Sequence, residues 1–226
     1  MQPSKTAILI FANSSAVEAR RKGIPKSGSL FTALNEDILK KVKKTKLPYV
    51  LCTEDAQVGT DFGTRFTSAI ASVFARGFER VITVGNDTPH LSTKKLLHVL
   101  KNLEQGKTVV GPSTDGGVYV LGFHRDSFEA KSFRALPWQR AVLCDAIIRH
   151  FSRWGSPYVL PRLTDIDALR DVRTLLHTVR PLALVLRKLL LALLSQQPPV
   201  AEQDARESTR FFQSNLFNKG SPLGVS

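Results

Sequence analysis

The stretch that decides the fold is Val81-Ile-Thr-Val-Gly-Asn-Asp-Thr-Pro-His-Leu-Ser92. It begins with β-branched apolar side chains, which is typical of a short strand buried on both faces. The run stops at Gly85, and Ser92 is placed to cap a helix that starts near Thr93. Asp87 therefore follows a buried strand and precedes a helix, which is where open α/β sheets bind their ligands. A turn-capping role for Asp87 is the alternative that this spacing leaves open.

Length and composition limit the classes of protein to which the chain can belong. The chain has 226 residues, 42% of them hydrophobic, which suffices for one domain with a sizeable core. Cys52 and Cys144 are far apart and in no metal-type spacing, so a reduced, cytoplasmic setting is expected. The sequence contains no apolar run of membrane-spanning length and no signal peptide at its start. The formal net charge of +13 indicates an anionic partner, namely nucleotide phosphates, nucleic acid or an acidic membrane surface.

Two further strands are expected before the central stretch: a buried first strand at residues 6–12 (TAILIFA) and a second strand at residues 47–53 (LPYVLCT). A polar loop rich in cations follows the first strand. Cations at this place in an α/β fold are well placed to meet phosphates, and a solvated charge run is the alternative. The candidate phosphate ligands are Arg20, Arg21 and Lys26.

Helices are expected between these strands. Apolar residues at every fourth position predict an amphipathic helix over residues 29–46. A turn over residues 57–66 leads into another helix, which Gly77 closes.

The alternation continues after the central stretch. The expected elements are a helix at 93–105, strands at 108–111 and 118–123, a helix at 136–154, a strand at 158–160 and a helix from 168. This order predicts an α/β, Rossmann-like fold with a mostly parallel sheet and helices on both faces. The short step at residues 112–123 predicts one small antiparallel insertion, with a tight turn at Asp115-Gly116-Gly117.

Three segments are expected along the chain: a domain over residues 1–180, an apolar helix over 181–195 and a loosely ordered polar tail over 196–226. The helix is interrupted only by Arg187 and Lys188. Packing on the domain or on a second copy of the chain, as a homodimer, is predicted. Weak contact with an anionic membrane surface is the alternative.

Several common motifs are missing from the sequence. Gly111 and Gly116 have P-loop spacing, but Gly117 stands where the lysine should be. There is no G-x-G-x-x-G after the first strand, no Cys/His zinc framework and no G-x-S-x-G elbow. The remaining candidates are carboxylates near the ends of predicted strands: Asp87, Asp115, Asp165 and Asp167.

Carboxylates that converge in this way predict a site for Mg²⁺ or Mn²⁺, because these ions prefer oxygen ligands. Such an ion would neutralise charge on a diphosphate leaving group or on a transferring phosphorus. For Asp165 and Asp167, a helix-capping role is the alternative.

Five motifs occur in a distinctive order. They are Gln57-x-Gly59-x-x-Phe62-Gly63-x-Arg65, Gly85-Asn86-Asp87-x-Pro89-x-Leu91, Gly111-Pro112-x-x-Asp115-Gly116-Gly117-x-Tyr119-x-x-Gly122, Leu136-Pro137-Trp138 and Asp165-Ile166-Asp167. Together they resemble the bacterial glycosyltransferase-like, or selenodomain-associated, transferases of the nucleotide-diphospho-sugar transferase superfamily. The resemblance covers roughly residues 6–176.

This resemblance implies a GT-A fold with a nucleotide bound over the first half of the sheet. It implies a divalent cation at Asp87, and it implies that Asp115 acts on the sugar or acceptor side and as a second metal ligand. Residues expected to shape the nucleotide or acceptor pocket are Gln57, Gly59, Arg65 and Asn86.

The loop after the first strand departs from the family pattern. Many relatives have a Gly-Lys-x-Lys-Thr-Arg-Leu type loop there, whereas residues 18–26 read EARRKGIPK, which keeps the charge and not the pattern. The glycine-rich loop of sugar-nucleotide pyrophosphorylases is also missing after Phe11, which favours glycosyl transfer over nucleotidyl transfer.

We therefore expect a metal-dependent transferase that uses a nucleotide or nucleotide-sugar donor and an unidentified acceptor, with Asp87 and Asp115 as catalytic residues. One alternative is a nucleotidyltransferase that joins a nucleoside triphosphate to a phosphorylated acceptor. A second is a non-catalytic nucleotide-binding module. Specific nucleic-acid binding is not expected, because the lysine run at residues 40–46 has no interleaved aromatic side chains for base stacking.

Overall fold

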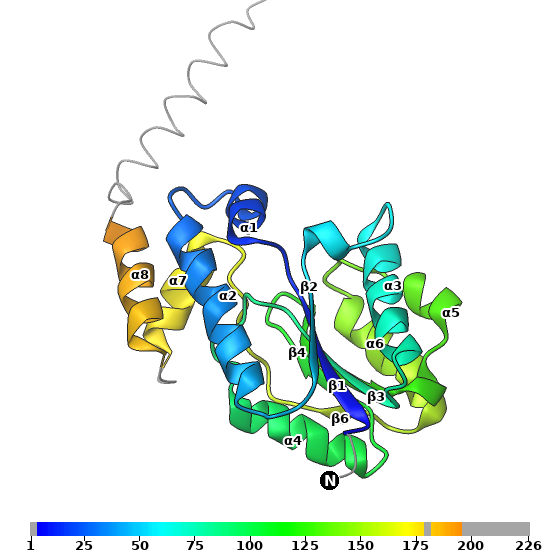
Figure 1. The fold of residues 1–226 in the computed structure, drawn as a ribbon. Helices are drawn as coiled ribbons and strands as arrows, with labels where there is room; N and C mark the ends of the chain where they lie inside the picture. The colour runs from blue at the N-terminus through cyan, green and yellow to red at the C-terminus, as the bar shows by residue number, and fades with distance from the viewer. Residues whose placement is uncertain (1–3, 179–181, 196–226) are drawn as a thin grey trace, which may run out of the picture.

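A computed structural model describes residues 4–178 and 182–195 of the chain. Its strands form one sheet in the order β2-β1-β3-β5-β4-β6 (Figure 1). The strands are β1 (Thr6–Phe11), β2 (Tyr49–Cys52), β3 (Arg80–Val84), β4 (Val109–Pro112), β5 (Val118–His124) and β6 (Tyr158–Val159). β5 runs antiparallel to both of its neighbours, and the other pairings are parallel. The predicted mostly parallel sheet with one antiparallel insertion is confirmed.

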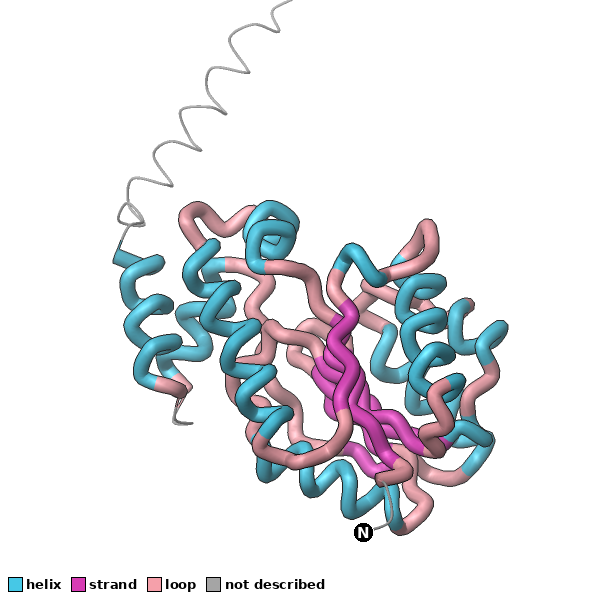
Figure 2. Tube along the Cα trace, in the orientation of Figure 1, coloured by secondary structure: helices cyan, strands magenta, loops and turns pink. Residues whose placement is uncertain are grey.

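Helices cover both faces of this sheet. The α-helices of the described residues are α1 (Ser15–Lys22), α2 (Gly28–Lys43), α3 (Phe62–Ala75), α4 (Thr93–Glu104), α5 (Ala130–Arg134), α6 (Leu143–Phe151), α7 (Leu169–His177) and α8 (Leu184–Ser195). Figures 1 and 2 show α3, α5 and α6 on one side of the strands and α2 and α4 on the other.

The central strands are apolar on both faces because both faces are covered. Along β1, Ala7 and Leu9 pack into the cluster with α3 and α6, while Ile8 and Ile10 pack with α2 and α4. Successive side chains of a strand point to opposite faces, so a continuous apolar run is what two covered faces require. The helix predicted after the central strand begins as expected, with Ser92 Oγ accepting a hydrogen bond of 3.2 Å from Lys95 N.

The segment after β1 is a helix, α1, where the sequence predicted a polar loop. Gly23 ends it with a left-handed φ of 61°. The helix escaped prediction because it has no apolar stripe, the signal on which a helix prediction depends. Six of its eight residues are alanine, glutamate, arginine or lysine, which are good helix formers.

The predicted helix at 136–154 is wrong over its first seven residues, 136–142. Residues 135–142 form turns, and α6 starts only at Leu143. Gln139 has a φ of 62°, which a helix interior does not accommodate. These turns bring Cys144 N within 2.9 Å of Gly116 O, so they join the start of α6 to the turn between β4 and β5.

The apolar helix predicted for residues 181–195 is present as α8, which lies against α2 and α7 (Figure 1). Its buried leucines Leu186, Leu190 and Leu193 belong to a cluster shared with those two helices. The homodimer and the membrane contact stay predictions. In the described ranges 4–178 and 182–195, no helix combines the length and the apolar character needed to cross a membrane. The polar tail predicted for 196–226 lies outside the described residues.

Candidate functional site

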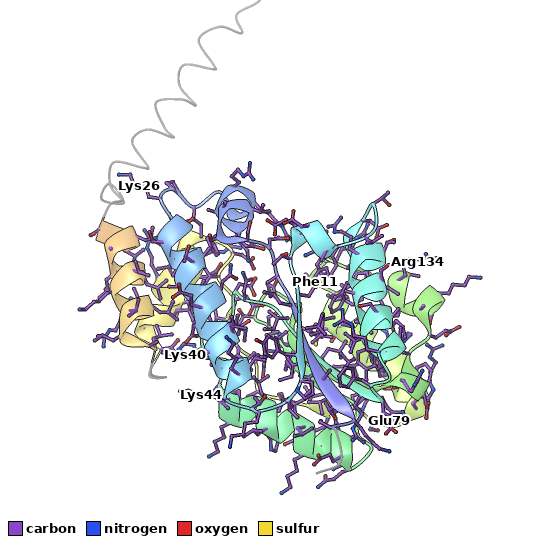
Figure 3. The ribbon with its side chains drawn as sticks, viewed as in Figure 1. Phe11, Lys26, Lys40, Lys44, Glu79 and Arg134 are labelled. Atoms are coloured by element: carbon purple, nitrogen blue, oxygen red, sulfur yellow. The ribbon has the colours of Figure 1, made fainter. Side chains whose placement is uncertain are left out.

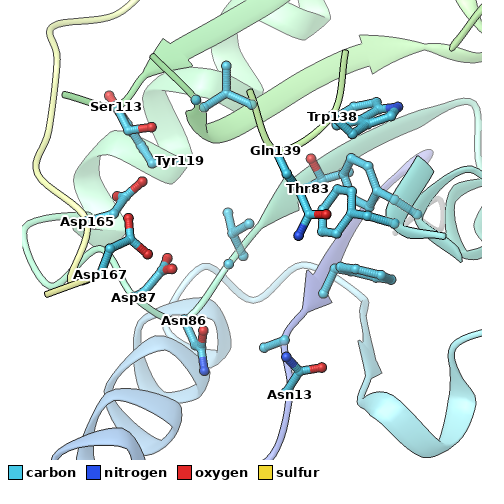
Figure 4. A pocket seen from close by; sticks show the side chains of 18 of the residues that line it. Asn13, Thr83, Asn86, Asp87, Ser113, Tyr119, Trp138, Gln139, Asp165 and Asp167 are labelled. Atoms are coloured by element: carbon cyan, nitrogen blue, oxygen red, sulfur yellow. The ribbon is translucent and has the colours of Figure 1, made fainter. Parts of the chain in front are cut away.

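A cavity of about 790 Å³ opens where the parallel strands end, between β1, β3 and the turn that joins β4 to β5. Open α/β sheets bind ligands at this edge because the loops after neighbouring parallel strands diverge there. The volume is within the range of about 300–1,000 Å³ that is usual for small-molecule sites. In the close-up of Figure 4, aspartates lie on one side of the cavity and Trp138 on the other.

The four aspartates singled out from the sequence all line this cavity. Asp87 follows β3 and Asp115 lies in the β4–β5 turn, whereas Asp165 and Asp167 follow β6. Figure 4 shows the side chains of Asp87, Asp165 and Asp167 pointing toward one another.

Backbone hydrogen bonds bring the segment after β6 to the other carboxylates. Ile166 N donates to Asp87 O over 2.9 Å, and Thr114 N donates to Leu163 O over 3.0 Å. Ile166 itself is fully buried in the cluster formed with α2, α7 and α8. Its side chain anchors the segment in this core while Asp165 and Asp167, on either side of it, line the cavity.

Lys22, the last residue of α1, contacts two of these carboxylates. Its Nζ lies 2.7 Å from Asp87 Oδ2 and 2.6 Å from Asp167 Oδ1, and its side chain is only 7% exposed. Burial by itself lowers the pKa of Lys22, but the charges of Asp87 and Asp167 outweigh it, so the pKa lies above its ordinary value. Lys22 is therefore a buried, fully charged ammonium that bridges two carboxylates.

The other two aspartates are hydrogen-bonded to nearby donors. Asp165 Oδ1 accepts a bond of 2.5 Å from Thr88 Oγ1. Burial, followed by the charge of Asp87, raises the pKa of Asp165 well above its ordinary value. Asp115 Oδ1 accepts bonds from Ser113 Oγ at 2.7 Å and from Gly117 N at 2.9 Å.

As arranged, these residues do not fit a divalent metal ion. Carboxylates are the ligands that Mg²⁺ and Mn²⁺ prefer, so the chemistry of the predicted site is suitable. However, the ammonium of Lys22 fills the place between Asp87 and Asp167 where an ion would bridge them. Within residues 4–178 and 182–195, no group of three or more His, Cys, Asp or Glu side chains is arranged to hold a metal.

Aromatic side chains form the opposite wall of the cavity, and they come from three separate segments: Phe11, Phe62, Phe66 and Trp138. The ring centroids of Phe62 and Trp138 are 5.6 Å apart, and those of Phe66 and Trp138 are 5.2 Å apart. Trp138 Nε1 donates to Phe133 O over 3.0 Å, which fixes the indole in place. Two motifs that lie far apart in the sequence therefore meet in one wall.

Polar side chains from the loops after β1 and β2 and from α1 close the cavity between these two sides. Asn13 Nδ2 donates to Glu18 Oε1 over 2.7 Å, and Gln57 Nε2 lies 3.5 Å from Asn13 Oδ1. Glu18 is only 4% exposed, and its Oε2 has no hydrogen-bond partner among the described residues. A buried acceptor without a partner is costly, and a ligand donor would relieve that cost.

The residues predicted to bind a nucleotide or phosphate divide into two groups. Those that line the cavity are Arg21, Gln57, Arg65 and Asn86. Arg20, Lys26 and Gly59 do not line it and are exposed. Figure 3 shows Lys26 on the outside of the loop between α1 and α2, away from Phe11 at the end of β1. Because α1 is a helix, Arg20 and Arg21 point in directions about 100° apart.

Sequence reasoning missed the role of Lys22 and of Glu18, which it treated only as part of the charged segment. The signal that could have found them is their helical spacing. Residues three and four apart share a face of a helix, so recognising α1 would have placed Glu18, Arg21 and Lys22 together. Asn13 and Phe11 carried no signal beyond their position at the end of a strand.

The comparisons with known proteins bear on the family and the fold. The family model described as "Uncharacterized protein conserved in bacteria (DUF2064)" matches residues 26–140, just over half of the chain. The chain belongs to this family. A comparison with the curated proteins found no match.

Among solved structures, the chain is similar to a candidate nucleotide-diphospho-sugar transferase from Desulfovibrio desulfuricans. The identity is 23% and the TM-score 0.74, with 85% of this chain and 98% of that chain covered. This likeness establishes the fold and confirms the predicted resemblance in fold to the nucleotide-diphospho-sugar transferases.

Two weaker likenesses have TM-scores below 0.5. One is to Rv0371c of Mycobacterium tuberculosis in complex with manganese, at 15% identity and a TM-score of 0.45, with 77% of this chain and 98% of that chain covered. The other is to a glycosyltransferase involved in the glycosylation of the major capsid of PBCV-1, at 12% identity and 0.44, with 70% and 81% covered.

Proposed function

We propose that this protein is a transferase that binds a nucleotide or nucleotide-sugar donor in the cavity at the ends of β1 and β3 and transfers a glycosyl group from it. The observation that carries the proposal is that one cavity of about 790 Å³ joins an aromatic wall to a charged and polar side. A nucleotide-sugar is divided in the same way, because it has a flat base at one end and phosphates and sugar hydroxyls at the other.

The aromatic wall suits the base. Phe62 and Trp138 are partly buried, and their rings are held by packing against Phe66. Stacking of a base on an aromatic side chain contributes about 1–3 kcal/mol and tolerates any base, because each has a π-face. We assign the base to this side of the cavity.

The phosphates and the sugar go to the opposite side in this proposal. Arg21 and Lys22 line the cavity from α1 on this side, and Arg65 lines it from α3, the helix that carries Phe62 and Phe66. These cations supply N–H donors, which form strong hydrogen bonds with phosphate oxygens. Glu18 has a buried oxygen without a partner that could accept a bond from a ribose or sugar hydroxyl. Asp87 and Asp115, the predicted catalytic residues, would position the transferred sugar and its acceptor.

Catalysis in such a site consists of positioning the reactants and stabilising the charge of the leaving nucleoside diphosphate. Losing one charged interaction of this kind costs about 10²–10³ in rate. The predicted Mg²⁺ or Mn²⁺ cofactor stays a prediction that the residues as arranged do not favour, so the leaving-group charge is assigned here to Arg21 and Lys22.

Thermal unfolding of the purified protein with a panel of nucleoside triphosphates and nucleotide-sugars tests this proposal. A ligand at 100 times its Kd stabilises the folded state by about 2.7 kcal/mol. We expect nucleotides to raise the Tm of the wild type and of Trp154→Ala equally, because Trp154 is not among the residues that line the cavity. Trp138→Ala should lose most of that shift. A panel in which no nucleotide shifts the Tm would overturn the proposal.

The reaction products then separate the alternatives. Release of a nucleoside diphosphate identifies glycosyl transfer, and release of pyrophosphate identifies the nucleotidyltransferase. If the protein binds a nucleotide but transfers nothing to any offered acceptor, and if Asp87→Asn binds the nucleotide equally well, the non-catalytic nucleotide-binding module is favoured.

A further inference from the structure

We propose that Lys22 is the resident cation of the aspartate cluster, formed by Asp87, Asp115, Asp165 and Asp167, and that its ammonium takes the place of a divalent metal ion. The cluster gathers carboxylates from three loops at the edge of the sheet. Such a concentration of negative charge needs a cation nearby, and the described part of the chain supplies one from α1.

The geometry of Lys22 is that of a bridging cation. Its Nζ donates to Asp87 over 2.7 Å and to Asp167 over 2.6 Å, distances at the short end for hydrogen bonds between an ammonium and a carboxylate. The side chain of Lys22 is 7% exposed, whereas those of Asp87 and Asp167 are 26% and 45% exposed. The ammonium is therefore shielded from water by the protein more than its two partners are. The pair of carboxylates is 80 residues apart in sequence and is joined through this one nitrogen.

A metal ion would have to displace this ammonium. Metal–oxygen distances of about 2.0–2.1 Å for Mg²⁺ leave no room for Nζ between the same two carboxylates. An expelled Lys22 would lose both partners, and removing one partner of a buried charge pair is strongly destabilising. The remaining two carboxylates, Asp115 and Asp165, accept hydrogen bonds from Ser113 and Thr88, and among the described residues no group of three or more His, Cys, Asp or Glu side chains is arranged to hold an ion.

Lys22 also has a donor left for a ligand. An ammonium has three N–H groups, and the two hydrogen bonds to Asp87 and Asp167 use two of them. Lys22 lines the cavity, as does Arg21 beside it. If the proposed function holds, on which this step rests, the third N–H meets a phosphate oxygen of the donor and carries out the charge neutralisation otherwise expected of a metal.

A titration of the protein with Mn²⁺, followed by electron paramagnetic resonance of the free ion, tests the proposal without any nucleotide. We expect the wild type and Asp87→Asn to bind Mn²⁺ equally weakly. Lys22→Met empties the cation position and should gain a Mn²⁺ site at least about tenfold tighter. The site should disappear again in Lys22→Met/Asp87→Asn. Lys26→Met is the matched control, because Lys26 is exposed and outside the cavity, and it should behave as the wild type.

Two results would overturn the proposal: Mn²⁺ binding by the wild type that Asp87→Asn abolishes, or a folded Lys22→Met that gains no Mn²⁺ site. If Lys22→Met does not fold, the comparison between the wild type and Asp87→Asn decides alone. Where a nucleotide shifts the Tm, the shift should be the same with Mn²⁺ and with a chelator. A protein that binds no nucleotide contradicts the proposed function and leaves the Mn²⁺ result intact.

Discussion

Replacing Gly63 with alanine tests the packing that holds the aromatic wall in place. Gly63 is the second residue of α3 and is buried. A Cβ at this position would lie 2.6 Å from the carbonyl oxygen of Arg134 and 2.6 Å from Cδ1 of Trp138. Non-bonded carbon atoms pack at about 3.5–4.0 Å, so the neighbours must move by about 1 Å. Neither moves freely, since the first is backbone at the end of α5 and the indole is hydrogen-bonded to Phe133 O.

The magnitude follows from two opposing terms. Alanine in place of glycine stabilises a helix by about 0.4–1 kcal/mol, because it restricts the unfolded chain. Forcing a methyl group into a filled space costs about 1–3 kcal/mol. The net result is a loss of about 0–2.6 kcal/mol, or a Tm lower by up to about 10 °C for a domain of this size. The displaced Trp138 should also weaken binding of any ligand that stacks on it.

Urea unfolding and thermal unfolding measure this change, and Gly28→Ala is the matched control. Gly28 is the first residue of α2, and a Cβ added there meets no atom within 4 Å. We expect Gly28→Ala to be neutral or to raise the free energy of unfolding by up to about 1 kcal/mol. If Gly63→Ala matches Gly28→Ala in stability, the argument from close packing is refuted.

Two further predictions concern pH. The pKa of Asp165 is raised in the folded protein, so the wild type loses stability as the pH rises above about 3.9. Asp165→Asn should therefore have a higher free energy of unfolding than the wild type at pH 7 and the same free energy of unfolding at pH 3. His150→Gln should flatten the pH dependence below about 6.5, because burial and Arg153 lower the pKa of His150, so the wild type loses stability as pH falls. Urea unfolding across pH 3–8 measures both, with exposed Asp55→Asn as the control. A less stable Asp165→Asn at pH 7, or equal slopes for His150→Gln and the wild type, would contradict them.

Part of the candidate site was predictable because its signals are local. A buried strand ends at Val84, and Asp87 follows it before a helix capped by Ser92. Those facts place Asp87 at the ligand-binding edge of a parallel sheet without knowledge of any contact. The same reasoning placed Asp115 in the turn before β5.

The sequence by itself determined the class of fold, since apolar runs and helical periods report which surfaces must be buried. Only the tertiary structure decided what the site contains. Lys22 contacts Asp167, which is 145 residues away in the sequence. Gly63 packs against Trp138, which lies in a turn where the sequence predicted a helix. The physical reason is that the local pattern of apolar and polar side chains indicates which residues are buried, whereas the partner of a charged side chain depends on distances in space. Those distances arise when Ile166 enters the core beside α2 and α7 and places Asp167 against the ammonium of Lys22 at the end of α1.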